Sequence, residues 1–156
     1  GDGLYRRSLY TWWRRTTPPP NMLGFDAGTR ELCIARRQLT LTPLQPLVLL
    51  NDPQFVEAAR ALGERTLREG GSTPEARAMW AFLLVTGREP RAEEHSILVQ
   101  LYAEQLALFR EDPSKAERLM QVGDHKCDES LPRDELAAAT VMASALMNLD
   151  AAIMLR

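Results

Sequence analysis

The sequence predicts an all-α fold, an orthogonal helical bundle of about five to six helices preceded by an irregular, Pro-rich N-terminal arm. Thr or Asp directly precedes Pro at Thr42, Asp52, Thr73 and Asp112, and this pairing marks helix N-termini. Apolar residues then recur at helical spacing, with glycines at several of the expected helix ends. The chain has 156 residues, 45% of them hydrophobic and 26% charged, which fits a single globular domain.

The N-terminal arm should be the least regular part of the chain. From Leu4 to Trp13, apolar positions recur at helical spacing beside arginines, which predicts a short amphipathic helix. Pro18 to Pro20 should end this helix in an extended conformation. Residues 18–41 then lack a persistent period, although we expect a short strand near Leu32 to Ala35. We therefore divide the domain 1–156 into a basic aromatic arm, 1–41, and a helical body, 42–156.

Two helices should open the body. Thr42 can cap a helix that starts at Pro43, and Pro46 should remove a backbone hydrogen bond there and distort it. Asp52 followed by Pro53 predicts a second helix that ends at Gly70 and Gly71.

The remaining helices follow the same signals. The third should run from Pro74 to Gly87 and pack four large side chains inward: Met79, Trp80, Leu83 and Leu84. The fourth should begin at Pro90 and bury Leu98, Leu101, Tyr102 and Phe109. A short helix follows Asp112, and then a polar loop at 123–131. The last helix, from about Arg133 to Asp150, is apolar or small around most of its circumference, so it should be central to the bundle.

Charge is divided unevenly along the chain. Residues 1–37 hold seven Arg and three acidic residues, a net charge of +4, while the remainder carries −6 and the whole chain −2. We expect the basic arm to lie across the acidic body by charge complementarity, and we expect no nucleic-acid partner. No apolar run approaches the roughly 20 residues that span a bilayer. We therefore expect no membrane span.

Several strings of the sequence resemble one bacterial family in the same order along the chain. They are Leu4 to Trp13, Pro18 to Leu23, Phe25 to Ala27, Arg30 to Cys33, Thr42 to Gln45, Leu49 to Ala59, Thr86 to Arg88 and Ser144 to Asp150. The chain resembles the uncharacterised C-terminal domain, a domain of unknown function of the planctomycete PSD type, of planctomycete cytochrome c-type multidomain proteins. Leu41 and Pro46 depart from the family pattern, in which we expect Asn and Ala.

The resemblance implies a cellular setting and no established catalytic residues. It implies that the chain is a fragment of a larger exported, periplasmic or cell-surface protein, with any export signal outside this chain. Neighbouring domains of the same protein, including a c-type cytochrome domain, would be its partners. The chain itself has no Cys-x-x-Cys-His run for covalent haem, so we expect no cofactor in this domain.

Isolated chemical groups do not define a metal or nucleophilic site. His125 and Cys127 lie in the polar loop, but two ligands one residue apart do not complete a tetrahedral site, so we expect no metal and a solvated loop. Cys33 and Cys127 could form one bridge in an exported protein, or each could be a small buried side chain. His95 has no partner identifiable from sequence.

The candidate binding surface combines the arm with its junction to the body. Its members are Arg6, Arg7, Tyr10, Trp13, Asp26, Arg30, Arg36, Arg37, Asn51 and Asp52. The leading hypothesis is a non-catalytic interaction or scaffolding domain that docks through this Arg- and aromatic-rich surface. The alternative is part of an extracellular enzyme acting on polysaccharide or another polar polymer, with Asp26 and Asp52 as acids. No catalytic motif decides whether the protein is an enzyme.

Overall fold

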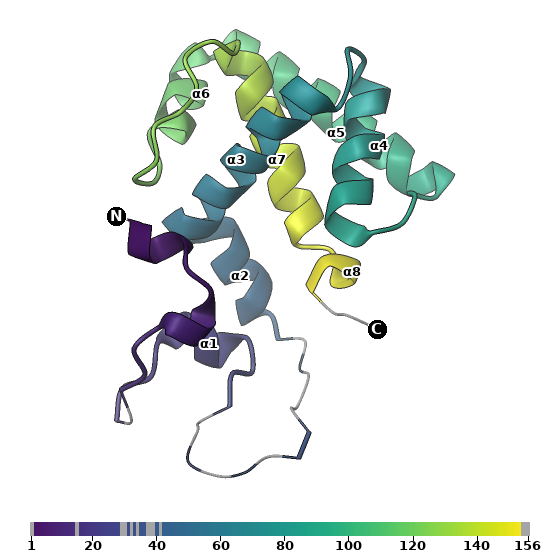
Figure 1. Ribbon diagram of the computed structural model, residues 1–156. Coiled ribbons are helices and arrows are strands. Elements are labelled where there is room, and N and C mark those ends of the chain that lie inside the picture. The colour runs from purple at the N-terminus through teal and green to yellow at the C-terminus, as the bar shows by residue number, and fades with distance from the viewer. Residues whose placement is uncertain are drawn as a thin grey trace. The chain divides into compact units, whose positions relative to one another are not determined.

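The computed structural model describes residues 2–14, 16–28, 31, 33, 35–36, 40 and 42–153, and all its regular elements within those residues are helices (Figure 1). The prediction of an all-α fold is therefore confirmed. The chain divides into two compact units, residues 1–48 and 49–156, and the boundary between them lies within a helix. Packing of the arm on the body and orthogonal helix crossing stay predictions.

The start of the N-terminal unit differs from the predicted amphipathic helix. Two short 3₁₀ helices, η1 (Asp2–Tyr5) and η2 (Ser8–Tyr10), replace it. The reason lies at Arg7, whose extended backbone (φ −55°, ψ 143°) interrupts the helical path, and Thr11 is extended again after η2 (φ −70°, ψ 128°). Helical spacing of apolar residues was not enough to form one continuous α-helix here, because these side chains have little core to pack against and remain exposed.

A second correction concerns the proline run. Pro19 is extended, but Pro20 begins a short helix, α1 (Pro20–Gly24). Proline fits the first position of a helix because its missing N–H would have no intrahelical partner there. The predicted strand includes Leu32 and Ile34, which lie outside the described residues, whereas Cys33 and Ala35 belong to no strand.

Helix α2 (Leu44–Asn51) starts one residue after Pro43, and Pro46 does not break it. Pro46 is the third residue of the helix, and the first four N–H groups of any helix lack an intrahelical acceptor. The expected loss of a backbone hydrogen bond was therefore wrong. Leu41, the other departure from the family pattern, lies outside the described residues.

Among the described residues, six further helices follow α2: α3 (Pro53–Glu69), α4 (Pro74–Thr86), α5 (Ala92–Glu111), α6 (Pro113–Met120), α7 (Arg133–Met147) and α8 (Asp150–Ile153). Three predicted caps are confirmed. Asp52 Oδ1 accepts from the Gln54 N–H at 2.9 Å, Thr73 Oγ1 from Ala76 at 3.2 Å, and Asp112 Oδ1 from Ser114 at 3.2 Å. No helix in the described ranges has the length and hydrophobicity needed to cross a membrane.

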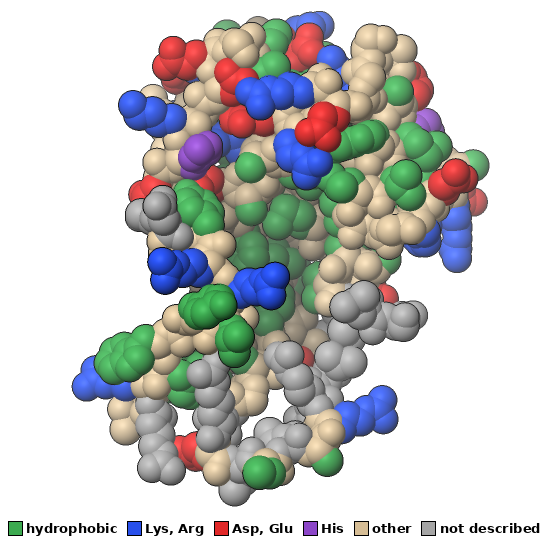
Figure 2. Space-filling view, in the orientation of Figure 1, with side chains coloured by type: hydrophobic (Ala, Val, Ile, Leu, Met, Phe, Trp, Pro, Cys, Tyr) green, Lys and Arg blue, Asp and Glu red, His purple; other side chains and the backbone are tan. Residues whose placement is uncertain are grey.

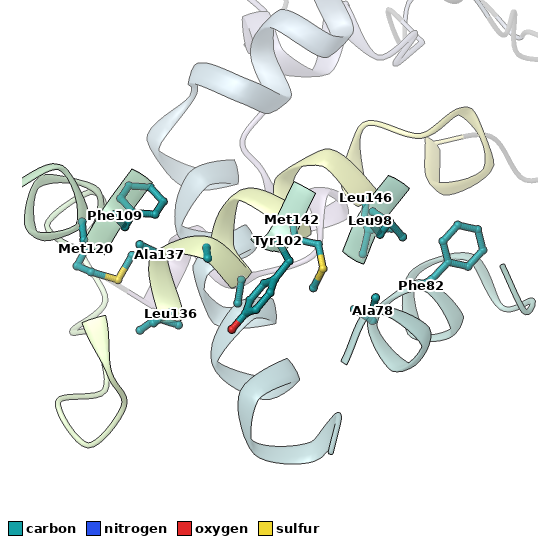
Figure 3. Packing of buried hydrophobic residues seen from close by; sticks show 14 residues of the cluster. Ala78, Phe82, Leu98, Tyr102, Phe109, Met120, Leu136, Ala137, Met142 and Leu146 are labelled. Carbon is teal, nitrogen blue, oxygen red and sulfur yellow. The ribbon is translucent and has the colours of Figure 1, made fainter. Parts of the chain in front are cut away.

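Helix α7 is the centre of the core, as predicted from its composition. It packs against α3, α4, α5, α6 and α8, and its residues Leu136 to Thr140 are fully or almost fully buried. In Figure 3 the cluster extends along α7, with Phe109 and Met120 toward one end and Phe82 toward the other. A helix surrounded in this way must be apolar or small on most sides.

Helices α3 and α7 approach closely because α3 carries a glycine at their contact. A Cβ on Gly63 would lie 3.1 Å from the Thr140 backbone nitrogen and 3.2 Å from the Ala139 carbonyl carbon. Both atoms belong to the backbone of α7, so they cannot move away by a change of side-chain rotamer. A larger residue at this position would therefore have to push the two helices apart.

We predict that Gly63→Val lowers the free energy of unfolding by about 1–3 kcal/mol, through overpacking of the helix contact. Ala61→Val is the matched control, because Ala61 is exposed on the same helix and the change there alters only helix propensity. Urea unfolding followed by circular dichroism measures both variants. Equal stabilities of the two variants would contradict the close-approach explanation.

The inward face of α4 was predicted wrongly. Met79, Leu83 and Leu84 are 38%, 46% and 46% exposed, whereas Ala78, Ala81 and Phe82 are completely buried. Trp80 is partly buried and does pack against the core. Helix α4 is apolar on almost every side, so its sequence period could not identify which side faces α7. The prediction for α5 was better, since Leu98, Tyr102 and Phe109 are buried.

Candidate functional site

The predicted binding surface is divided between the two units. Arg6, Arg7, Tyr10, Trp13, Asp26 and Arg36 belong to the N-terminal unit, and Asn51 and Asp52 to the C-terminal unit. Arg30 and Arg37 lie outside the described residues.

The N-terminal unit presents what we call the basic aromatic segment, residues 5–14. Leu9, Tyr10 and Trp12 are 72%, 69% and 79% exposed, and Arg6 and Arg7 are exposed between the two 3₁₀ helices. Trp13 is half-buried. Hydrophobic and basic side chains lie next to one another on this unit in Figure 2. Short turns separated by extended residues leave these side chains on the surface, where a continuous amphipathic helix would have turned one face inward.

Asp26 fastens the backbone of the N-terminal unit. Its carboxylate accepts from the Thr40 N–H at 2.7 Å and from the Thr40 hydroxyl at 2.7 and 2.9 Å. Nearby, the buried Gln45 amide donates to the Gly24 and Thr40 carbonyls at 3.0 and 2.9 Å. These contacts join the end of α1 to the start of α2. Asp26 thus has a structural role, even though its left-handed backbone (φ 56°) is unusual for a non-glycine residue.

Asp52 also has a structural role, in the other unit. Its side chain caps α3, as described above, and neighbouring Asn51 is exposed at the last position of α2. Capping carboxylates commonly satisfy the first N–H groups of a helix without any catalytic role. The two candidate acids of the enzyme hypothesis are therefore each engaged in holding backbone, one in each unit.

A buried charged row on α3 was not identified from the sequence. Glu57, Arg60 and Glu64 are 6%, 2% and 9% exposed. Their spacing of three and four residues places them on one side of the helix. In a sequence, charged residues at this spacing are typical of a solvated helix face. The one sequence feature that could have indicated their burial is the neighbouring pair of small residues, Ala59 and Gly63, which allow close helix packing.

This row holds the backbone of the loop that follows α6. Arg60 donates to the carbonyls of Met120, Val122 and His125, the first two at 2.5 and 2.8 Å. Glu57 accepts from the N–H groups of Asp124 and His125 at 2.6 and 3.0 Å. These bonds satisfy the polar groups of a long connection that has no secondary structure of its own.

The same row continues to the end of the loop. Glu64 accepts from the Asp128 N–H at 3.1 Å, and Arg68 on the next turn pairs with the Asp128 carboxylate. Gly123 fits beneath Glu57 with φ +93°, and a Cβ there would lie 2.1 Å from Glu57 Oε2. Hydrogen bonds therefore hold the loop along its length, and residues 123–126 are exposed, as expected of a solvated loop.

Cys127 and His125 do not converge on one point. The Cys127 thiol is partly buried, lies 3.7 Å from Met120 Sδ and accepts from Arg133 at 2.8 Å. Burial raises the pKa of the Cys127 thiol, and Arg133 opposes this. The His125 side chain is exposed. Within the described residues, no three His, Cys, Asp or Glu side chains form a group able to hold a metal ion.

Two other sequence hypotheses are settled by contacts. Cys33 and Cys127 are both free thiols, and Cys33 is exposed. They therefore form no disulfide bridge. The alternative, that each cysteine is a small buried side chain, holds only in part, for the partly buried Cys127. His95 does have a partner, because its Nε2 lies 2.9 Å from the Glu75 carbonyl. This contact joins the first turns of α4 and α5 and gives His95 a structural role.

The fold and the candidate surface define an all-α protein that combines an exposed basic aromatic segment with a helical unit built around α7. The sequence comparison gives the family. Residues 1–102 match the model of PSD1, a protein of unknown function (DUF1553), and the chain belongs to that family. The predicted resemblance to a PSD-type domain is confirmed over this range. No curated protein and no solved structure matches the chain.

Proposed function

We propose that the chain is a non-catalytic interaction domain of a larger exported bacterial protein associated with c-type cytochrome domains. It docks onto a neighbouring domain of that protein through the basic aromatic segment. The observation that carries this proposal is the exposure of Leu9, Tyr10 and Trp12 beside Arg6 and Arg7. Aromatic residues and Arg are enriched in the centres of protein interfaces, where they contribute most of the binding energy.

Charge indicates the chemistry of the partner. Residues 1–37 carry a net charge of +4, so an acidic surface would be attracted to this segment and oriented on it. The arginines can form two parallel hydrogen bonds with a carboxylate, and their planar groups also stack on aromatic rings. The partner surface should therefore present Asp and Glu around an apolar centre.

The alternative enzymatic function has less support. It needs carboxylates that can exchange protons with a substrate, whereas Asp26 holds Thr40 and Asp52 caps α3. Replacing either carboxylate should therefore lower the stability of the fold, whether or not the protein has an enzymatic activity. This favours the interaction function over acid or base catalysis at these two residues.

A binding measurement with the other domains of the same protein tests the proposal. We expect the variant Arg6→Ala/Arg7→Ala to bind them at least about tenfold more weakly, the scale of a lost interface hot spot. The control is Arg110→Ala/Arg118→Ala, which removes the same charge from exposed positions of the C-terminal unit. Isothermal titration calorimetry measures both, after circular dichroism shows native helix content. Equal binding by the two variants would overturn the proposal.

A further inference from the structure

Helix α4 is apolar on the side that faces away from the core as well as on the side that faces it. Ala78, Ala81 and Phe82 fill the inner side with no exposed surface. The outer side carries Ala76, Met79, Leu83 and Leu84, and Trp80, which also packs against the core, lies at its edge. These residues follow the spacing i, i+3, i+4, i+7 and i+8 of a single helix face. We call these five residues the outer stripe.

The outer stripe reaches the surface of the C-terminal unit. Met79, Leu83 and Leu84 are between 38% and 46% exposed, and Trp80 is partly covered by the Arg65 guanidinium, 5.4 Å from its ring. Green side chains lie at the surface in Figure 2 where Figure 1 places α4. A helix that is apolar all round is normally buried on all sides. Contiguous apolar surface of this kind marks a protein contact.

We propose that the outer stripe binds the outer stripe of a second copy of this chain, with the two α4 helices antiparallel. A two-fold axis near the middle of α4 places Met79 of each copy against Leu83 of the other. The same axis brings Glu75, in the first turn, toward Arg88, just beyond the last turn, and both residues are exposed. The stripe thus complements itself in charge, as a two-fold interface requires.

Two further features favour the antiparallel arrangement. The dipoles of antiparallel helices oppose one another, so each N-terminus lies beside a C-terminus of opposite partial charge. Arg88 already pairs with Glu94 at 2.7 Å and stacks on Phe82, at 4.8 Å from the ring centre. These contacts hold the guanidinium at the end of the stripe, where a second carboxylate can join it at little entropic cost.

The size of the stripe sets the expected affinity. One helix face offers less than the roughly 800 Å² per partner of a stable complex. We therefore expect a reversible dimer with a dissociation constant on the order of 10–100 μM. Sedimentation velocity of the 156-residue chain across that range should show the weight-average mass rising toward two copies. A chain that stays monomeric at about 1 mM would overturn the proposal.

A matched pair of variants tests the surface. Leu83→Glu should weaken the dimer at least about tenfold, because it buries a charge at the centre of an apolar contact. Leu108→Glu on α5 should leave dimerisation unchanged, since Leu108 is exposed to the same degree, 47% against 46%, but lies outside the stripe. Loss of dimerisation in both variants, or in neither, would overturn the proposal.

Disulfide trapping tests the orientation independently of affinity. In a Cys33→Ser background, a chain with Met79→Cys is mixed with a chain with Leu83→Cys under mild oxidation. The antiparallel arrangement predicts that the mixed disulfide between the two chains predominates. Predominance of the two like disulfides would indicate a parallel pair and overturn the proposed arrangement.

Discussion

Replacing Arg60 with Ala should lower the free energy of unfolding by about 3–5 kcal/mol, because it removes the cation from a buried charged row. Three carbonyls, that of Met120 at the end of α6 and those of Val122 and His125 in the loop, would each lose their donor. Buried polar groups left without a partner cost about 1–3 kcal/mol each in mutational series. Water entering the space would recover part of this cost, so the total stays within the stated range.

Urea unfolding of two further variants separates charge from packing. Arg60→Met fills much of the same volume without donors, and we expect it to recover only the smaller part of the loss. Arg118→Ala, at an exposed position of α6, should change stability by no more than about 0.5 kcal/mol. Full recovery by Arg60→Met would contradict the role of the three hydrogen bonds.

Phe82→Ala should be the second large effect, at about 3–5 kcal/mol. Phe82 has no exposed surface and lies at the α4 end of the core cluster in Figure 3. Truncation of a buried aromatic side chain removes its apolar burial and leaves a cavity that neighbours fill only partly. The adjacent residue provides the control, because Leu83 is 46% exposed and Leu83→Ala should cost less than about 1 kcal/mol.

Thermal unfolding at low protein concentration measures both variants without a contribution from self-association. A larger loss for Leu83→Ala than for Phe82→Ala would mean that the outer and inner sides of α4 are reversed. It would also remove the surface proposed for the dimer.

Local signals in the sequence predicted the helix starts well. Asp52, Thr73 and Asp112 cap α3, α4 and α6 as expected, and Gly87 ends α4 in a left-handed conformation (φ 71°). These features depend on residues within one turn of each other, so their chemistry can be read from a short window. The central position of α7 followed in the same way from its own composition.

Features that depend on distant contacts were missed. The buried charges of α3 hold loop groups 60 and more residues away, and no local pattern distinguishes such a row from a solvated one. The inner side of α4 was wrong because both of its sides are apolar. In the arm, helical spacing predicted one helix, but extended backbone at Arg7 separates two 3₁₀ helices, and little core is present to favour the longer helix.

The candidate binding surface was predicted as one group of residues, and only part of that group remains a candidate for binding a partner. Arg6, Arg7 and Tyr10 are exposed together on the N-terminal unit, whereas Asp26 and Asp52 hold backbone in separate units. Carboxylates beside turns and helix starts are ambiguous in a sequence, because capping and catalysis favour the same residue types. Exposed aromatic residues beside arginines indicate a binding surface more clearly, since aromatic side chains on a solvent-exposed surface contribute little to the stability of the fold.

Hydrogen exchange of the chain, alone and with the other domains of its protein, tests the docking role of the basic aromatic segment most directly. Our account predicts slower exchange at the amides of residues 5–14 in the complex, with no change in α6. Unchanged exchange at residues 5–14, together with slower exchange elsewhere in the chain, would contradict it.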